Sequence, residues 1–94
     1  MDQSVVHDVE SKEFFIITEG NKAFLKYKVI NKEILDYYST FVPKELRGKG
    51  IAGLVTRAAL EFAKTNHYYI IPSCPYVESY IAKHTEYQDL LSSF

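Results

Sequence analysis

The first 42 residues alternate between short β-prone runs and polar turns, which is the pattern of an antiparallel sheet. In the clearest run, Leu25, Tyr27 and Val29 fall on one face and two lysines fall on the other, the period-two alternation of a strand with one solvated side. The connections are too short to hold crossover helices, so we expect a meander. The predicted strands cover residues 5–9, 14–18, 23–29 and 34–42, and the last of them is the longest.

Polar clusters and a proline mark the ends of these runs. Residues 19–22, with the sequence Glu-Gly-Asn-Lys, offer the positive-φ positions that a tight hairpin needs. Asn31 and Lys32 predict the next reversal. Pro43 ends the fourth run, because proline has no N–H to donate to a neighbouring strand.

After Gly50 the hydrophobic period changes from two residues to about 3.6, which predicts an amphipathic helix. Polar residues occupy the other side of this segment, and Asn66 is the predicted terminator. The apolar positions are Ile51, Leu54, Val55, Ala58, Ala59, Phe62 and Ala63.

The remainder of the chain predicts one more strand, a short helix and a docked tail. Residues 68–71 form a continuous apolar run, typical of a parallel strand that is buried on both faces. Pro75 fits the first turn of a helix that carries Val77, Tyr80 and Ile81 on one side. Residues 85–94 have no clear period, but their apolar residues predict that they dock on the domain. These are Tyr87, Leu90 and Leu91.

Composition and charge narrow the class of protein. With 47% hydrophobic and 15% aromatic residues, the 94-residue chain is expected to form a single domain, residues 1–94. Its net charge of -1 creates no overall field toward nucleic acid or a membrane surface. The apolar runs are far shorter than the ~20 residues that span a bilayer. Acidic residues at positions 2, 8 and 10 do not predict a secretory signal, so we expect a cytoplasmic protein.

Cysteine and histidine usage argues against metal binding. Cys74 is the only cysteine, which excludes an intramolecular disulfide and a cysteine-rich zinc site. The histidines, His7, His67 and His84, show no pattern of metal-ligand spacing. We therefore expect no metal, and any role of the sulfur is that of a single thiol.

The hexapeptide Arg47-Gly48-Lys49-Gly50-Ile51-Ala52 lies between the longest predicted strand and the amphipathic helix. Backbone N–H groups at a helix start have no intrahelical partner, and the helix dipole adds partial positive charge there. Glycines let the backbone approach a phosphate closely, and the two cationic side chains add full charges. Residues 43–66 hold five basic residues against two acidic ones, whereas the rest of the chain is net acidic. The loop is therefore a candidate anion site.

Taken alone, the hexapeptide fits a structural turn as well as a phosphate site. A dinucleotide fingerprint would need a third glycine and a βαβ unit at the start of the domain, and a Walker loop would need a Gly-Lys-Ser/Thr ending. Neither pattern is present, which disfavours the common nucleotide loops.

The loop and its surroundings resemble the GCN5-related N-acetyltransferases. The pyrophosphate motif of that family, R/Q-x-x-G-x-G/A, is matched by Arg47, Gly50 and Ala52. The order of the predicted elements and the Val42-Pro43 pair before the loop also match.

The chain is also similar to very small members of this family, in which a Cys-Pro-aromatic segment follows the last strand. That segment is Cys74-Pro75-Tyr76-Val77 here, and the resemblance covers about residues 5–91. It implies the α+β class and the minimal acyl-CoA N-acyltransferase (GNAT) fold, a mostly antiparallel mixed sheet with two main helices.

The resemblance implies an N-acetyltransferase that moves acetyl from acetyl-CoA to an amine. The loop amides would hold the pyrophosphate of coenzyme A, and its pantetheine arm would pair with the end of the long strand like an added strand. The thioester would lie where this strand and residues 68–71 separate, near Cys74, its carbonyl polarised by a backbone N–H. The implied coenzyme residues are Thr40, Phe41, Val42, Arg47, Gly48, Lys49, Gly50, Ile51 and Ala52.

The candidates for the chemistry are Cys74, Tyr80 and His84. Larger relatives place a general-acid tyrosine on the last helix, where this chain has Ile81, with Tyr80 one residue earlier. Cys74 could accept the acetyl group or shuttle a proton, although a single cysteine is often only a buried apolar group. His84 could act as a base or lie at the surface, and Asp36 could activate an amine through water or be a solvated carboxylate.

Two other functions compete with acetyl transfer. A non-catalytic coenzyme A sensor or interaction module fits an intact loop without a tyrosine at the aligned acid position. A nucleic-acid interaction domain is disfavoured by the net acidic charge. The acceptor is undefined, because residues 10–13 leave room for a turn only where larger relatives insert helices that shape the acceptor site. A small amine, a protein terminus or lysine, a completing partner protein and a homodimer stay open as alternatives.

Overall fold

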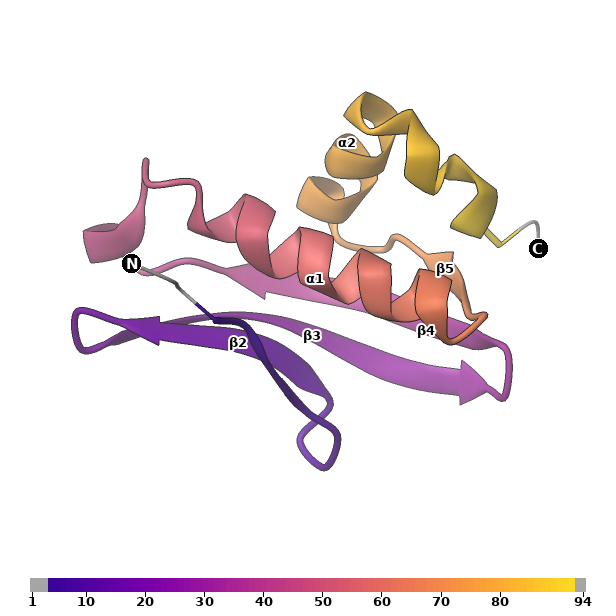
Figure 1. Ribbon diagram of the computed structural model, residues 1–94, viewed down its shortest axis with the longest axis horizontal. Helices are drawn as coiled ribbons and strands as arrows, with labels where there is room; N and C mark the ends of the chain where they lie inside the picture. Colours follow the sequence, from indigo (N-terminus) through magenta and orange to yellow (C-terminus); the bar gives the residue numbers. More distant parts are fainter. Residues whose placement is uncertain (1–3, 93–94) are drawn as a thin grey trace.

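The protein is a five-stranded mixed sheet with one long helix, α1 (Ile51–Thr65), lying across one face (Figure 1). The computed structural model describes residues 4–92. The strands follow chain order across the sheet, antiparallel from β1 to β4, and α1 carries the chain over to β5, which is parallel to β4. The predicted meander and parallel strand are confirmed. The other elements are β1 (Val6–Asp8), β2 (Glu13–Thr18), β3 (Asn21–Asn31), β4 (Ile34–Phe41), β5 (Tyr69–Ile71), α2 (Pro75–Lys83) and the 3-10 helices η1 (Lys44–Leu46) and η2 (Thr85–Leu90).

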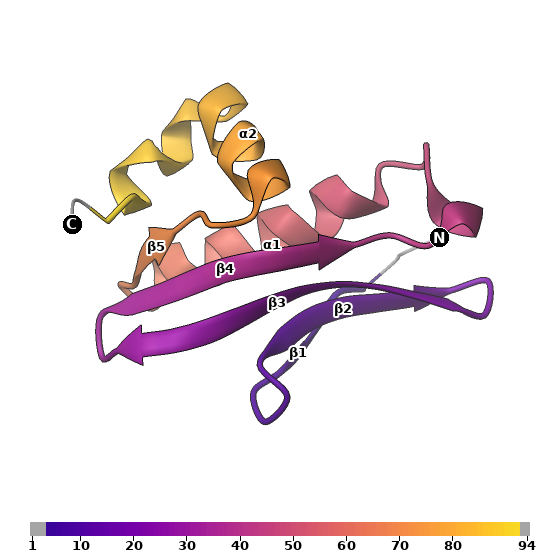
Figure 2. The same cartoon turned by 180° about the vertical axis from the view of Figure 1, so that it is seen from behind.

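The helical segments α2 and η2 lie beside α1, on the side of β5 (Figure 1). Within residues 4–92, no helix crosses the opposite face of the sheet (Figure 2). Tyr87 of η2 is buried, and its hydroxyl donates a hydrogen bond to Glu61 of α1. The Ser92 N–H donates to the carbonyl of Ile70 at 3.0 Å. The predicted docked tail is confirmed as far as Ser92, and residues 93–94 lie outside the described part of the chain.

The β2–β3 hairpin forms as its residues predict. Thr18 pairs with Asn21, and the two residues between them, Glu19 and Gly20, have φ values of 54° and 75°. This left-handed pair is the signature of a type I′ turn, whose twist matches that of the flanking strands.

The longest strand is β3, so the prediction that residues 34–42 form the longest one is wrong. β3 has 11 residues and β4 has eight. β3 continues through Val29 to Asn31, and the Asn31 side chain supports the reversal by accepting the Glu33 N–H at 2.8 Å. The β3–β4 register shifts once beside Tyr27 and again after Val29. Val29 lines a pocket together with Tyr27 and Leu35, so it shares their face as predicted. It is nevertheless 51% exposed, because β2 pairs with β3 only as far as Lys26.

The strand β5 corrects a second prediction. It was expected to be buried on both faces, but Tyr69 is half exposed while Ile70 is fully buried. Consecutive side chains of a strand point to opposite faces, so Ile70 faces the helices while Tyr69 lies on the face that no helix of the described chain covers (Figure 2). The predicted short helix after Pro75 is confirmed as α2, with Val77 and Ile81 buried.

The core lies between the sheet and α1. Small residues on the buried side of α1, Ala59 and Ala63, let the helix approach the strands closely. Tyr37 of β4 is fully buried, and its hydroxyl donates to the Ala59 carbonyl at 2.6 Å. This bond satisfies a buried phenol and fixes the height of α1 above β4. The large fully buried side chains include Ile16, Leu25, Leu35, Leu46, Ile51, Val55, Leu60, Ile70, Val77 and Ile81.

Candidate functional site

The segment between β4 and α1 turns twice through left-handed backbone conformations. Gly48 and Gly50 have φ values of 80° and 75°, which glycine adopts without the strain that other residues incur. Gly50 is the residue immediately before α1. These two glycines therefore set the path by which the chain enters the helix.

Six consecutive amides in this segment are unpaired. The first hydrogen bond of α1 runs from the Leu54 N–H to the Gly50 carbonyl at 3.2 Å. Among residues 4–92, the N–H groups of residues 48–53 donate to no protein acceptor. No acidic residue lies in the first turn of α1. Unpaired amides at the positive end of a helix dipole attract anions, so this is an anion site formed by backbone.

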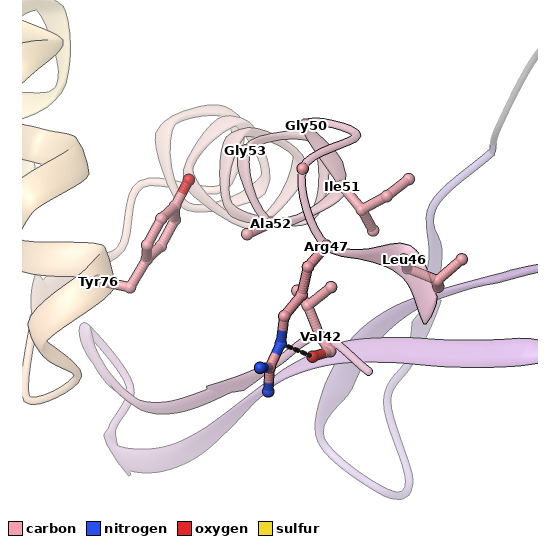
Figure 3. A pocket seen from close by; sticks show the side chains of 9 residues that line it. Val42, Leu46, Arg47, Gly50, Ile51, Ala52, Gly53 and Tyr76 are labelled. Atoms are coloured by element: carbon pink, nitrogen blue, oxygen red, sulfur yellow. Dashed lines mark hydrogen bonds between the residues drawn. The ribbon is translucent and has the colours of Figure 1, made fainter. Parts of the chain in front are cut away.

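A pocket of about 160 Å³ lies beside these amides (Figure 3). Tyr76 of α2 faces the start of α1 across the pocket. A Cβ on Gly53 would lie 3.7 Å from the Tyr76 hydroxyl oxygen, so α2 approaches α1 closely at this glycine. Sequence reasoning missed Tyr76 and Gly53 as site residues; a glycine inside a helical pattern was the available signal. The lining residues are Val42, Leu46, Arg47, Gly48, Gly50, Ile51, Ala52, Gly53 and Tyr76.

The two cationic side chains of the loop point to different places. Arg47 lines the pocket and donates from Nε to the Val42 carbonyl at 3.2 Å (Figure 3). Lys49 does not line the pocket; its Nζ lies 2.8 and 3.0 Å from the two carboxylate oxygens of Glu19 in the β2–β3 turn. Of the two side chains predicted to bind phosphate, only Arg47 is positioned at the pocket.

The strands β4 and β5 separate beside this pocket. They pair only where Ile34, Leu35 and Asp36 face β5. The next contact is the Cys74 N–H, which donates to the Tyr37 carbonyl at 3.0 Å. Beyond it, residues 38–41 have no strand on that side within the described chain. The end of β4 therefore offers an open backbone edge that runs from Cys74 toward the glycine loop.

Cys74 lies where the two strands separate. It is 5% exposed, and its Sγ donates to Thr40 Oγ1 at 3.3 Å. It is also the residue immediately before α2, and Val77 and Ile81 continue the buried side of that helix. The structure therefore brings Cys74 to the strand whose end was predicted to hold the pantetheine arm.

Tyr80 and His84 lie together on another side of α2. Six residues, about 1.7 helical turns, separate Tyr80 from Cys74. The rings of Tyr80 and His84 stack with centroids 3.9 Å apart, and His84 Nδ1 lies 2.9 Å from the Tyr80 carbonyl. That bond needs a proton on Nδ1, which leaves Nε2 as the basic nitrogen. The geometry pairs Tyr80 with His84 and does not pair either of them with Cys74.

The two phenols on this side of α2 stay protonated at neutral pH. Burial raises the pKa of Tyr76, and it also raises the pKa of Tyr80 despite the opposing charge of Arg57. A protonated phenol is a hydrogen-bond donor. Either tyrosine can therefore donate a proton or a hydrogen bond, but only Tyr76 lines the pocket.

Asp36 lies at the last β4–β5 pair, on the sheet face opposite α1. Its neighbour Tyr37 reaches α1, and consecutive side chains on a strand point to opposite faces. The Asp36 Oδ1 atom is buried and has no hydrogen-bond partner within residues 4–92. In the same part of the chain, no three His, Cys, Asp or Glu side chains gather as a metal site. None of the described helices has the length and apolar character needed to cross a bilayer.

The open strand edge, the glycine loop and the pocket define the class of protein, an α+β domain of the acyl-CoA N-acyltransferase type. A GCN5-like protein from Staphylococcus aureus, solved by NMR, shares this fold. The TM-score is 0.75, with 24% sequence identity, and the match covers 98% of this chain and 90% of that one.

The family follows from the sequence comparisons. A family model described as GCN5-related N-acetyl-transferase matches residues 13–90, and the chain belongs to this family. It is 33% identical over 79 residues to Protein NATD1 of Mus musculus, covering 82% of this chain and 72% of that protein. Protein NATD1 of Danio rerio is 30% identical over 87 residues, with 88% and 79% covered. The family and the fold class expected from the sequence are confirmed.

Proposed function

We propose that this chain is an acetyl-CoA-dependent N-acetyltransferase. One observation carries the proposal: unpaired amides at the start of α1 line a pocket with Val42, and the open edge of β4 that precedes Val42 begins beside Cys74. When bound, acetyl-CoA supplies an acetyl group activated as a thioester. Membership of the family supports the same class of reaction.

The loop binds the diphosphate mainly through its backbone. The amides of residues 48–52 donate to the phosphate oxygens, and Arg47 adds a guanidinium at the pocket wall. The backbone amide of Lys49 is already available to the diphosphate. Its ammonium group can bind the diphosphate only after it separates from the Glu19 carboxylate. An exposed ion pair of this kind is worth about 0–1 kcal/mol, so a diphosphate can compete with the carboxylate for the ammonium.

The open edge of β4 holds the pantetheine arm. Its amides pair with the free backbone groups around Thr40, Phe41 and Val42, as an added strand would. A backbone N–H near Val42 polarises the acetyl carbonyl, which a preorganised donor can do without reorganisation. The Arg47 side chain already holds the Val42 carbonyl, which stiffens this end of the strand.

Cys74 acts on the thioester in one of two ways. In the covalent route, its sulfur forms a bond to the acetyl carbon, its proton goes to the departing coenzyme sulfur, and a neutral amine then displaces the restored thiol. In the direct route, the amine attacks the acetyl carbon, Cys74 protonates the departing sulfur, and the proton that the amine loses returns to the Cys74 thiolate. Both routes give an amide, free coenzyme A thiol and an unchanged protein.

Tyr80 and His84 remain candidates for the remaining proton transfers. Nε2 of His84 accepts the proton that the acceptor amine loses, and the Tyr80 hydroxyl acts as a donor. The Tyr80 ring lies 6.3 Å from that of Tyr76 but does not line the pocket, so these roles require that the acceptor or the coenzyme reaches beyond Tyr76 along α2. Tyr76 can act as a donor without this requirement, because it already lines the pocket.

A matched pair of glycine substitutions tests the coenzyme assignment. Gly50 and Gly20 have the same φ of 75°, and a Cβ on either would meet nothing within 4 Å. Gly50→Glu and Gly20→Glu therefore impose similar backbone strain, but Gly50→Glu places its carboxylate at the start of α1, whereas Gly20→Glu places it in the β2–β3 turn. Calorimetric titration with coenzyme A should show at least about tenfold weaker binding for Gly50→Glu alone. Equal affinities in two folded variants would refute the loop assignment.

A non-catalytic coenzyme A-binding module is the second candidate. The observation in its favour is that Tyr80 and His84 pair with each other and not with Cys74. Intact-mass spectrometry and assay of free thiol after incubation with acetyl-CoA and a broad panel of amines separate the two functions. Tight binding without acetyl transfer to any amine or to Cys74 would favour the module.

A further inference from the structure

The sheet face opposite α1 carries an aromatic row. Phe15, Phe24 and Phe41 are direct cross-strand neighbours on β2, β3 and β4. The rings of Phe24 and Phe41 lie 5.5 Å apart. No helix within the described chain covers this face (Figure 2). Phe41 and Ile17 therefore stay largely exposed, at 46% and 62%.

Lysines lie over the aromatic rings of this face. Lys26 Nζ is 5.3 Å from the centre of the Phe24 ring, and Lys28 Nζ is 5.0 Å from that of Tyr38. Neither lysine has a carboxylate within ion-pair distance in the described residues. A third lysine, Lys22, is already paired with Glu13 at 2.9 Å. The face thus combines apolar rings with two cations that have no acidic partner.

This face reaches the point where β4 and β5 separate. Asp36, whose Oδ1 is buried and unpartnered within residues 4–92, is the cross-strand neighbour of both Lys28 and Ile71. Tyr38 is the extra residue at the β4 bulge and lies beneath Lys28. On the helix side of these strands, Cys74 is buried against Thr40, and α2 begins at the next residue. The uncovered sheet face is the other direction from which an acceptor can approach the separated strands.

We propose that this face docks the acceptor, an acidic polypeptide segment with apolar residues, and that Asp36 receives the acceptor's amine. The inference rests on the proposed acetyl transfer. Acidic side chains of the acceptor pair with Lys26 and Lys28, and its apolar residues cover Phe24 and Phe41. A carboxylate without a partner is a natural site for an ammonium group, which must lose a proton before it attacks.

Charge decides against a second copy of the chain as the occupant. Two such faces placed together would bring unpaired lysines against lysines, and like charges in contact disfavour association. A single-stranded nucleic acid also suits lysines and rings. Its affinity depends on neutralising a row of phosphates, but this face offers only two lysines without an acidic partner in the described residues, and the net charge of the chain is -1. An acidic polypeptide is therefore favoured.

Paired peptides test the docking directly. The probe is Glu-Asp-Phe-Lys-Phe-Asp-Glu with a fluorescein label, and the control is Gln-Asn-Phe-Lys-Phe-Asn-Gln with the same label. Fluorescence anisotropy with the coenzyme-free protein should show about tenfold tighter binding of the acidic peptide at about 0.05 M salt. The difference should shrink severalfold at about 0.5 M salt, because screening weakens exposed charge pairs.

Charge-neutral variants locate the surface. Lys26→Gln/Lys28→Gln keeps both side-chain stems and should abolish the preference for the acidic peptide. Lys83→Gln, an exposed lysine in the last turn of α2, is the matched control and should preserve it. Equal binding of the two peptides, or a preference that survives the double variant, overturns the docking proposal. So does tighter binding of a labelled oligouridylate than of the acidic peptide.

The same peptides separate failure of the docking from failure of acetyl transfer. Preferential binding of the acidic peptide without acetylation of its lysine would overturn the proposed function and leave the docking intact. Acetylation of both peptides at equal kcat/KM would overturn the docking and leave the function intact. Asp36→Asn should lower kcat on the acidic peptide while leaving its affinity within about twofold, and an unchanged kcat would remove Asp36 from the amine site.

Discussion

The glycine loop and helix α2 approach the same pocket but contribute to it in different ways. The loop presents six backbone amides that have no partner among residues 4–92, and two positive-φ glycines and the start of α1 set their directions. α2 contributes side chains at different heights: Cys74 lies immediately before the helix, Tyr76 lines the pocket, and Tyr80 stacks on His84 at the far end. Binding of an anion is therefore built into the chain path, whereas the chemistry depends on which side of α2 meets the substrate.

Among the substitutions that test this difference between the loop and α2, replacement of the Cys74 thiol should have the largest effect on activity. We expect Cys74→Ala to lower the rate of acetyl transfer by about two or more orders of magnitude while coenzyme affinity stays within about threefold. The measurements are kcat from free thiol release and Kd from calorimetry. Thr40→Val, which removes only the hydroxyl that accepts the Sγ hydrogen bond, is the control. Wild-type turnover in Cys74→Ala would make the thiol a packing residue.

Phenylalanine substitutions on α2 should have a smaller effect. Tyr76→Phe removes the hydroxyl that lies in the pocket, and we expect it to lower kcat by about tenfold. Tyr80→Phe keeps the stacking on His84 and should lower kcat less, because its ring does not line the pocket. A larger loss in Tyr80→Phe than in Tyr76→Phe would reverse this assignment and restore Tyr80 as the proton donor.

Alkaline pH should loosen the α2–η2 side before it affects the loop. Burial, reinforced by the hydrogen bond to Glu61, raises the pKa of Tyr87 to about 12. A phenol whose pKa is higher in the folded state than the usual value of about 10 stabilises the fold below pH 10. This contribution disappears as the pH rises from about 10 to 12.

The measurement is denaturant unfolding across that pH range for the wild type and for Tyr87→Phe. The variant should show a shallower alkaline decline in the free energy of unfolding. An identical decline in both proteins would assign the pH dependence to other tyrosines, of which buried Tyr37 also has a raised pKa.

The smallest expected effect is a gain in stability at the contact between the two helices. Gly53 has no positive φ, and an added Cβ would lie at ordinary van der Waals distance, 3.7 Å from the Tyr76 hydroxyl oxygen and 3.9 Å from Tyr80 Cε2. Gly53→Ala should therefore raise the free energy of unfolding by about 0.5–1 kcal/mol. A loss of stability in thermal unfolding would mean that α2 cannot accommodate even one methyl group here.

Much of the fold could be predicted, because it depends on local rules. Positive-φ residues placed the β2–β3 turn, Pro43 ended β4, and the change of hydrophobic period located α1 between Gly50 and Asn66. The length of β3 could not be predicted, because the β-bulges depend on the register with β4 and not on residue type. Burial of β5 was overestimated because an apolar run does not reveal whether both faces of its sheet are covered.

The candidate site could be predicted as far as its backbone and no further. Glycine spacing pointed to the loop amides, but the Lys49–Glu19 pair joins residues 30 positions apart and depends on the folded hairpin. Tyr76 appeared in the sequence only as part of the Cys-Pro-aromatic segment. Its place in the pocket depends on the rotation of α2 about its own axis, which a pattern of apolar residues fixes only roughly.

The sequential order of the strands has a consequence for synthesis of the chain. Because β1 to β4 pair with their neighbours in sequence, the meander needs no segment beyond Phe41 and can pair while α1 is still inside the ribosome. One face of the meander stays exposed until α1 packs on it. The other face is not covered by any helix of the described chain. The lysines that lie over the rings of this second face place charges on the nascent meander, and such charges reduce its tendency to aggregate.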